Sequence, residues 1–553
     1  MSRTVGPAML SLALLGLATC AASRETISGW VSDRNGPVSG AIVRVQASEV
    51  FTTTDTGGAF TLTGLAPDRP VILTAWASGY YIVAGETPVL PGAGDVRLEL
   101  IPHAASDNPD YEWLSAFASA GDPNNCQNCH SRPGDPESAL PFDEWRLDAH
   151  SNSALNPRFL TMYTGSDTAG NQSPLTRKGF SRDYGSFPRP PDLSRPYFGP
   201  GYRLDFPRTA GNCAACHVPA AAVQAPYGVD PRRVSGVGRE GVTCDFCHKV
   251  WAVRLDDSGR PHPNMPGVLS FEFRRPSEGH QFFAGPFDDV APGEDTFSPL
   301  QRQSQFCAPC HFGMFWDATV YNSFGEWLDS PYSDPQTGQT CQECHMPSGL
   351  TDHFVRREAG GRTRDPGTIF SHRMRGASDE EFLQNAVSIT VDARKENEEV
   401  VVEVEIVNDN TGHHIPTGSP LRHVILLVRV SDSAGHRLTQ LAGPTVPEWG
   451  GAGDPVRGHY AGLPGTIYAK VLQEVWTESY PSGAYWNPTR VLSDNRIPAL
   501  KRDRTTYRFS GARDGNVTIE VKLIYRRAFI ELIRQKGWDV RDILMARQAR
   551  VLR

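Results

Sequence analysis

Cys213-Ala-Ala-Cys216-His217 is one of five copies of a single pattern in this 553-residue chain. The other copies are Cys126-Gln-Asn-Cys129-His130, Cys244-Asp-Phe-Cys247-His248, Cys307-Ala-Pro-Cys310-His311 and Cys341-Gln-Glu-Cys344-His345. Together they use ten of the eleven cysteines, and only Cys20 remains. Two thiols three positions apart, followed directly by His, are typical of c-type haem attachment. The thiols add to the two vinyl groups of one porphyrin and the His ligates its iron, so the pattern predicts five c-type haems.

Other cysteine chemistries fit this pattern less well. Structural zinc uses paired C-x-x-C motifs but does not require His after every second Cys. A disulfide framework would not repeat one spacing five times, and a thioredoxin-like motif would occur once. Ferric haems with ionised propionates carry about -1 each, so five would add roughly -5 to the formal charge of -8. This acidic balance excludes the basic footprint of a nucleic-acid-binding protein.

The N-terminus has the features of a secretory signal. Arg3 precedes an apolar stretch over residues 8–17, and small residues follow. We therefore exclude residues 1–23 from the fold and predict export across the inner membrane, to the periplasm or to the outer membrane and cell surface. Leu17-Ala-Thr-Cys20 also resembles the lipobox of bacterial lipoproteins, in which Cys20 is lipidated. The alternative is cleavage after Ala21 or Ser23, and a lipid anchor is the only membrane attachment that we predict.

Residues 25–102 read as a small β-domain. Short alternating strands lie between turn clusters such as Asp33-Arg-Asn-Gly-Pro37 and Thr54-Asp-Thr-Gly-Gly58, which favours a β-sandwich. The run Gly-x-Val, Gly-Pro-Val-x-Gly-Ala and Thr-Asp-x-Gly-Gly-x-Phe resembles the carboxypeptidase regulatory-like domain. That resemblance implies a seven-stranded sandwich without catalytic residues, which acts as a spacer or stabilising module.

The rest of the chain divides into two further predicted domains, which makes the protein multidomain. Residues 104–375 hold all five motifs and are rich in Pro and Gly, so we expect a mostly α and irregular haem domain with short helices at the motifs. The short intervals from Cys213 to Cys244 and from Cys307 to Cys341 predict two compact haem pairs. Residues 376–553 alternate again, for example at 400–407 and 517–523, and predict a second β-sandwich. A terminal helix over Arg526–Arg534 packs on it in this interpretation.

Five haems with two His ligands each need five histidines beyond the motifs, and eleven are available. Local context favours His150, His280, His372 and the pair His413/His414, while His353 and His262 compete for the fifth place. Neighbouring side chains of an extended segment point opposite ways, so only one of the pair should ligate, and we prefer His413. His423 falls in an apolar strand and is assigned to the core. The remaining histidines, His103, His436 and His459, are assigned to ordinary loops.

Several of these segments carry a resemblance. They are Glu326-Trp-Leu-Asp-Ser330, the last motif with Met346-Pro347, Ser371-His372-Arg373 and Thr411-Gly-His-His-Ile-Pro-Thr-Gly418. Together they resemble a bacterial family of secreted multihaem cytochromes related to the cytochrome c-554 and hydroxylamine oxidoreductase group. The resemblance covers about 110–550 and implies electron transfer, with His150, His372 and one of His413/His414 as distal ligands. The additional N-terminal sandwich departs from the simplest family pattern.

The expected function is therefore single-electron transfer along five haems, without a catalytic residue. Its expected partners are other redox proteins or an extracellular electron acceptor. The alternative is a multihaem oxidoreductase that acts on a nitrogen or sulfur oxyanion at one open haem. Cytochrome nitrite reductases typically mark the active haem with Lys in place of the motif His, whereas all five motifs here end in His. A surface binding module that happens to carry haem is the third interpretation and rests on the sandwiches alone.

Overall fold

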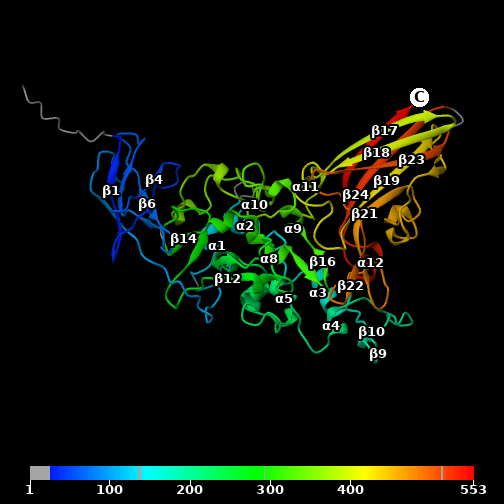
Figure 1. The fold of residues 1–553 in the computed structure, drawn as a ribbon, viewed down its shortest axis with the longest axis horizontal. Coiled ribbons are helices and arrows are strands. Elements are labelled where there is room, and N and C mark those ends of the chain that lie inside the picture. Colours follow the sequence, from blue (N-terminus) through cyan, green and yellow to red (C-terminus); the bar gives the residue numbers. More distant parts are fainter. Residues whose placement is uncertain (1–24, 122, 135–138, 292, 512–514) are drawn as a thin grey trace, which may run out of the picture. The chain divides into compact units, whose positions relative to one another are not determined.

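The computed structural model describes residues 25–553 except 122, 135–138, 292 and 512–514. The signal segment and Cys20 lie outside the described residues. Contacts divide the chain into two compact units (Figure 1). The first contains the residues up to His103 together with Phe287–Phe297, and the second contains Ala104–Pro286 and Ser298–Arg553. No helix in the described part of the chain is long and apolar enough to cross a membrane.

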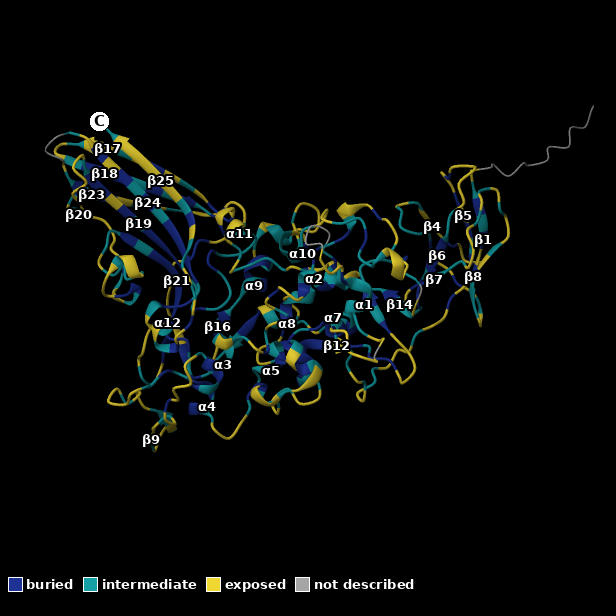
Figure 2. Cartoon of the chain, turned by 180° about the vertical axis from the view of Figure 1, so that it is seen from behind, coloured by how far each residue is buried: buried dark blue, intermediate teal, exposed yellow. Residues whose placement is uncertain are grey.

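The first unit is built from two four-stranded sheets. In one, β1 (Ile27–Asp33) pairs with β2 (Gly36–Pro37), β5 (Ala59–Leu62) and β8 (Val96–Glu99). The other has the order β4 (Phe51–Thr53), β3 (Ile42–Val45), β6 (Leu73–Trp76) and β7 (Val83–Ala84). Alternate residues of both sheets enter one buried cluster, in which Val31 and Leu98 meet Val43 and Leu73 (Figure 2). This confirms the predicted N-terminal β-sheet domain.

A segment from the middle of the chain completes this first unit. Asp288 accepts two hydrogen bonds from the Arg44 guanidinium, at 2.7 and 3.0 Å. Thr296, in β14 (Asp295–Phe297), accepts a hydrogen bond from Trp76 Nε1 at 3.0 Å. The chain thus leaves the second unit after Pro286, contributes Phe287–Phe297 to the first, and returns at Ser298.

The segment that carries the five motifs is mostly irregular, as the Pro and Gly content predicts. Each motif has a short helix: α1 (Gln127–His130), α5 (Ala214–His217), α7 (Cys244–Lys249), α8 (Ala308–His311) and α10 (Cys341–His345). Helices α2 (Pro141–Trp145), α3 (Pro157–Thr164) and α9 (Ser323–Leu328) support them. Small hairpins lie between, such as β11 (Val250–Val253) with β12 (Phe271–Phe273) and β15 (Gly313–Phe315) with β16 (Ala318–Tyr321).

The C-terminal region is rich in sheet, also as predicted. One sheet has the order β17 (Ser388–Glu396), β18 (Glu399–Val407), β23 (Arg502–Ser510) and β20 (Gln440–Ala442). The other has the order β22 (Thr489–Asp494), β21 (Gly465–Glu474), β19 (His423–Asp432), β24 (Val517–Arg526) and β25 (Ile543–Leu552). Both sheets supply one core, where Val402 and Tyr507 meet Leu426 and Val521. This region and the motif segment belong to the same compact unit.

The predicted terminal helix over Arg526–Arg534 is wrong in its bounds and in its position. Arg526 ends β24, the helix α12 runs over Ile530–Lys536, and the chain closes with the strand β25. The reason is that β25 is an edge strand, paired antiparallel with β24 alone and mostly exposed. Its Arg and Gln side chains protect the edge and hide the alternation by which a strand is identified from sequence.

A fully buried ion pair stabilises the third motif helix. Lys249 Nζ donates to Asp245, and neither side chain is exposed. The Asp245 carboxylate also accepts from the Tyr111 hydroxyl at 3.0 Å and from the Leu114 N–H at 2.8 Å. We expect Lys249→Met to lower the free energy of unfolding by about 3–5 kcal/mol, because it leaves a buried carboxylate without its counter-charge. Thermal unfolding followed by circular dichroism measures this loss.

The matched control for that variant is Arg254→Met. Arg254 pairs with Glu272 at 3.2 Å, but both side chains are about half exposed (52% and 48%). A surface pair of this kind contributes about 0–1 kcal/mol. Equal losses of stability in the two variants would contradict the importance assigned to the buried pair.

Candidate haem centres

Each motif folds into a single helical turn that presents its three functional side chains together. Positions i, i+3 and i+4 of a helix lie on one face, so both thiols and the imidazole are neighbours. The last motif shows how the sequence sets this turn. Thr340 Oγ1 accepts from the Glu343 N–H at 3.3 Å, and the Glu343 carboxylate accepts from the Thr340 N–H at 2.6 Å. This capping box starts α10 directly at Cys341.

Three motif histidines have Nδ1 bonded to a backbone carbonyl. His130 Nδ1 lies 2.8 Å from Phe354 O, His248 Nδ1 lies 2.8 Å from Ala284 O, and His345 Nδ1 lies 2.5 Å from Arg375 O. A hydrogen bond of this kind fixes the tautomer and orients Nε2 toward a metal. Burial also lowers the pKa of each of these imidazoles, which keeps them neutral as ligands must be.

Two motif histidines face a second imidazole at a distance that fits an iron ion. The ring centres of His150 and His311 are 6.2 Å apart, and those of His345 and His413 are also 6.2 Å apart. An imidazole nitrogen binds a metal at about 2.0 Å and its ring centre lies about 1.1 Å further, so two axial rings would be about 6.2 Å apart. The residues therefore fit the group that the motifs predict.

The outer imidazole of each pair is held through its Nδ1. His150 Nδ1 lies 2.6 Å from Asp148 Oδ1, and His413 Nδ1 lies 3.0 Å from His414 O. Both contacts leave Nε2 as the nitrogen for a metal. Burial lowers the pKa of His413 to about 4, with a further contribution from the His345 imidazole. The structure thus brings two of the sequence-predicted distal ligands to motif histidines.

The other predicted ligands fall into two classes. His372 lies in the interior, where burial lowers its pKa to about 3 and the nearby His248 and His130 imidazoles add to the effect. His353 is also buried, and its Nδ1 lies 2.5 Å from Asp352 Oδ1. In contrast, His280 and His262 are exposed. His423 is buried in β19 with its ring stacked on Phe529, which places it in the core as predicted.

Thiols of different motifs meet in three places. Hydrogen bonding between thiols raises the pKa of Cys244 through Cys126, that of Cys310 through Cys216, and that of Cys307 through Cys341. The predicted Cys307/Cys341 pair is thus brought together, whereas the predicted Cys213/Cys244 pair is not among the thiol contacts of the described residues. Motif helices pack across long sequence separations, so a short interval is a poor guide to proximity. These contacts link the attachment sites of the first and third motifs, and separately those of the second, fourth and fifth motifs. The Cys247 thiol of the third motif also acts on Cys307 and Cys310, which brings the two groups near each other.

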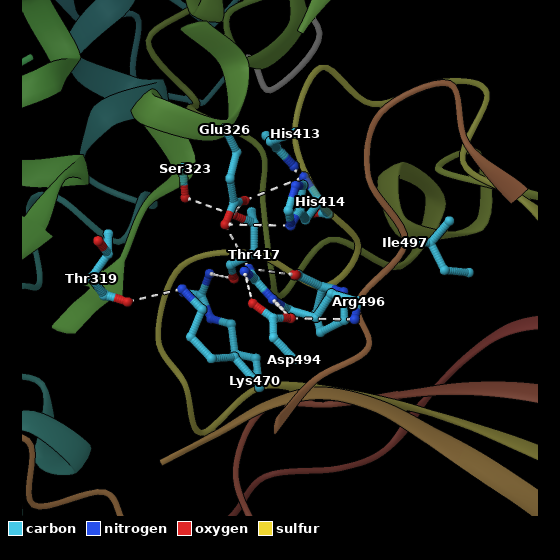
Figure 3. Close-up of polar contacts among 12 residues, drawn as sticks. Thr319, Ser323, Glu326, His413, His414, Thr417, Lys470, Asp494, Arg496 and Ile497 are labelled. Atoms are coloured by element: carbon cyan, nitrogen blue, oxygen red, sulfur yellow. Dashed lines mark hydrogen bonds and ion pairs between the residues drawn. The ribbon is translucent and has the colours of Figure 1, made fainter. Parts of the chain in front are cut away.

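A buried carboxylate holds the loop that carries His413, as Figure 3 shows. Glu326, in α9, accepts hydrogen bonds from the His414 N–H at 3.2 Å, from Thr417 Oγ1 at 2.5 Å and from Arg496 Nη1 at 2.6 Å. Arg496 in turn donates to Asp494 at 2.7 and 2.8 Å. Burial raises the pKa of Glu326, but Arg496 and the neighbouring His414 outweigh it, so the pKa lies below its usual value. The carboxylate is therefore charged and fixed.

A second Glu-Trp dipeptide repeats this arrangement at His372. The Glu144 carboxylate, in α2, accepts from the His372 N–H at 2.7 Å and from Ser371 Oγ at 2.9 Å. The tryptophan after each Glu anchors its helix through an indole N–H to a backbone carbonyl, at 2.8 Å for both Trp145 and Trp327. Sequence reasoning missed this role for the two glutamates. The Glu-Trp dipeptide alone could not have found it, because it also occurs at 112–113 and 448–449.

The His217 ring packs against an aromatic side chain. Its ring stacks on Phe159, with centres 3.8 Å apart and planes at 3°. Within the described residues its ring contacts include no second imidazole. Tyr321 and Tyr485 lie half-buried near Cys213 and Cys216, with ring centres 5.8 Å apart. The sequence did not single out either tyrosine.

Comparisons with known proteins agree with both parts of this architecture. Residues 26–100 match the family model of the carboxypeptidase regulatory-like domain. No curated protein matches the chain at a significant level. Among solved structures, the chain is similar to a penta-heme cytochrome c552 from Thermochromatium tepidum, with 18% identity and a TM-score of 0.50. That likeness covers 77% of this chain and 97% of the other. The chain therefore combines a carboxypeptidase regulatory-like domain with a region that shares the fold of a penta-heme cytochrome.

Proposed function

We propose that this protein is an extracytoplasmic multihaem c-type cytochrome that passes single electrons along five covalently attached haems. The observation that carries the proposal is the pairing of imidazoles, His150 with His311 and His345 with His413, at 6.2 Å between ring centres. An iron with an imidazole on each face has no free position for a substrate, and such a centre is suited to electron transfer. Thiols of different motifs lie close together, which supports short distances for electron transfer between neighbouring haems.

In this proposal the haem supplies one-electron redox chemistry and the chain supplies position and environment. Three of the five motif histidines are held by carbonyl oxygens. The candidate distal ligands, His150, His413, His372 and His353, are held by hydrogen bonds or by burial. Their neutral imidazoles favour lower potentials than a thioether ligand would. The electron partners are other redox proteins or an extracellular acceptor. Export, and a lipid anchor at Cys20, belong to the same proposal.

Spectroscopy of the purified holoprotein tests this function. We expect an intact mass that exceeds the processed chain by five haem masses, because all ten cysteines of the described chain fall in motifs. We also expect electron paramagnetic resonance spectra of low-spin haem, with little carbon monoxide bound after reduction. Four haems or fewer in fully matured protein would contradict the haem count.

A second candidate function rests on the surroundings of His217. A multihaem oxidoreductase needs one iron with an open position and nearby proton donors. The haem of Cys213 and Cys216 is the candidate, because Tyr321 and Tyr485 lie half-buried near its cysteines. Burial raises the pKa of Tyr485 above its usual value, so its hydroxyl keeps its proton. The other haems would deliver electrons to a nitrogen or sulfur oxyanion bound there.

Carbon monoxide distinguishes the two candidates. A carrier with two imidazoles on every iron binds little of it, whereas an oxidoreductase binds one equivalent at its open haem. If the wild type contains one high-spin haem and the His413→Ala and His150→Ala variants both retain it, the open position belongs to a haem that neither His413 nor His150 ligates. That result would favour the oxidoreductase over the carrier.

A further inference from the structure

Three arginines from separate segments converge where the motif segment meets the C-terminal sheet. In the antiparallel pair β19 and β24, His423 lies opposite Arg526. The preceding Arg422 and the following Arg527 therefore leave the sheet side by side. Arg158, in the first turn of α3, is the third, because Met162 of that helix packs in one apolar cluster with Leu421 and Ala528.

Hydrogen bonds hold α3 against this part of the chain. Trp538 Nε1 donates to Thr161 Oγ1 at 2.9 Å. Lys536 Nζ, fully buried, donates to Thr161 O and Ser166 O at 3.0 Å each. The position of Arg158 beside the two other arginines is thus fixed by packing and by buried hydrogen bonds.

The three guanidinium groups repel one another. Burial lowers the pKa of Arg158 to about 10, and the charges of Arg527 and Arg422 add to this effect. Burial also lowers the pKa of Arg527. Arg527 Nε is buried without a hydrogen-bond partner in the described chain, and Arg422 Nη1 donates only to a backbone carbonyl, Thr417 O at 3.2 Å. Like charges placed opposite each other on neighbouring strands are destabilising.

The adjacent Arg526 shows what the cluster lacks. Arg526 donates to the Asp542 carboxylate through Nε and Nη2, at 2.7 Å each. Among the described residues no carboxylate forms an ion pair with Arg158, Arg422 or Arg527, and Asp539 acts on Arg527 only at longer range. Charges removed from water are normally paired with an opposite charge. The charges of the cluster are therefore not balanced by an anion of the described chain, and an anion from another source would stabilise them.

Among the motif histidines, the one that responds to a charge of this cluster is His311, of the fourth motif. Burial lowers the pKa of His311 to about 3, and the charges of His150, His345 and Arg422 add to the effect, so Arg422 lies close to that imidazole. His150, whose ring faces His311, is also close along the chain to the start of α3. A haem carries two propionates, and guanidinium groups bind carboxylates with paired hydrogen bonds.

We propose that Arg158, Arg422 and Arg527 bind the propionates of the haem attached to Cys307 and Cys310. The assignment rests on the haem attachment in the proposed function, but not on the choice between carrier and oxidoreductase. Three positive charges against two negative ones favour the ferrous form of this haem, which carries less positive charge. Its cysteines contact those of the second and fifth motifs, so the cluster would raise the potential of a haem at a junction between motifs.

Spectroelectrochemical titration of Arg422→Gln and Arg527→Gln tests the proposal. We expect one of the five haems to move to a lower potential in each variant, while the other four stay near wild type. Arg422→Lys keeps the charge and should stay closer to the wild-type potential than Arg422→Gln. The control is Arg429→Gln, an exposed position on the same strand β19, which should leave all potentials unchanged.

Three results would overturn the assignment. The first is unchanged potentials of all haems in both Gln variants that retain a full haem mass. The second is a wild-type spectrum that responds to added inorganic sulfate at low ionic strength and loses this response in the variants, which would identify a soluble oxyanion as the ligand. The third is peptide mapping that finds no haem on Cys307 and Cys310. Only this third result would also count against the proposed function.

Discussion

We expect the His413→Ala variant to contain one high-spin haem, attached to Cys341 and Cys344, in place of a low-spin one. The His413 ring lies 6.2 Å from that of His345, a separation that places one iron between two imidazoles. Removing His413 opens one face of this iron to water or carbon monoxide. Electron paramagnetic resonance and carbon monoxide titration of the reduced protein should both report about one haem in five.

His414→Ala is the matched control, one residue further along the same loop. The His414 side chain is 30% exposed, and its Nδ1 lies 3.8 Å from Glu326 Oε1. This variant should keep every haem low-spin. If both variants keep all haems low-spin with unchanged potentials, the C-terminal sheets are only a scaffold for the haem segment. If only His414→Ala produces a high-spin haem, His414 is the distal ligand and His413 is not.

That only one of His413 and His414 should ligate follows from the sequence for a local reason, and which of the two does so stays a prediction. A strand ends before Asn408, and Pro416 restricts the backbone of the loop that follows. Neighbouring side chains of an extended segment point to opposite sides, so one imidazole had to face the haem segment and the other had to face away. The motif helices were predictable on the same ground, because their spacing is a local property of the chain.

Features that depend on distant contacts were not accessible in this way. Glu326 meets Arg496 across 170 residues, and the three clustered arginines come from segments that only the fold brings together. The ligand role of His280 stays a prediction. Its aromatic neighbours suggested a buried site, but Phe282 takes the interior position and His280 lies on the surface. Local context identifies a buried segment, but it does not say which of its side chains is buried.

We expect Glu326→Ala to lower the free energy of unfolding by about 3–5 kcal/mol, because the variant breaks a buried ion pair. The Glu326 and Arg496 side chains are 2% and 5% exposed, and the carboxylate also holds Thr417 and the His414 N–H. Thermal unfolding measures the loss. Glu272→Ala, which removes one partner of an exposed pair with Arg254, should cost about 0–1 kcal/mol and serves as the control.

Stability alone would not show that Glu326 acts on the haem ligand, so the variant needs a spectroscopic signature as well. With the loop released, His413 should leave its iron for part of the time, and the high-spin fraction of one haem should grow with temperature. Glu326→Gln keeps an acceptor for the His414 N–H and should retain most of the low-spin form. The same reasoning applies to Glu144→Ala, which frees Ser371 and His372 and should affect a different haem. Since the two carboxylates share no hydrogen-bond partner within the described chain, the effects of the two variants should add in the double variant. A destabilised Glu326→Ala protein with five unchanged low-spin haems at every temperature would reduce Glu326 to a structural residue.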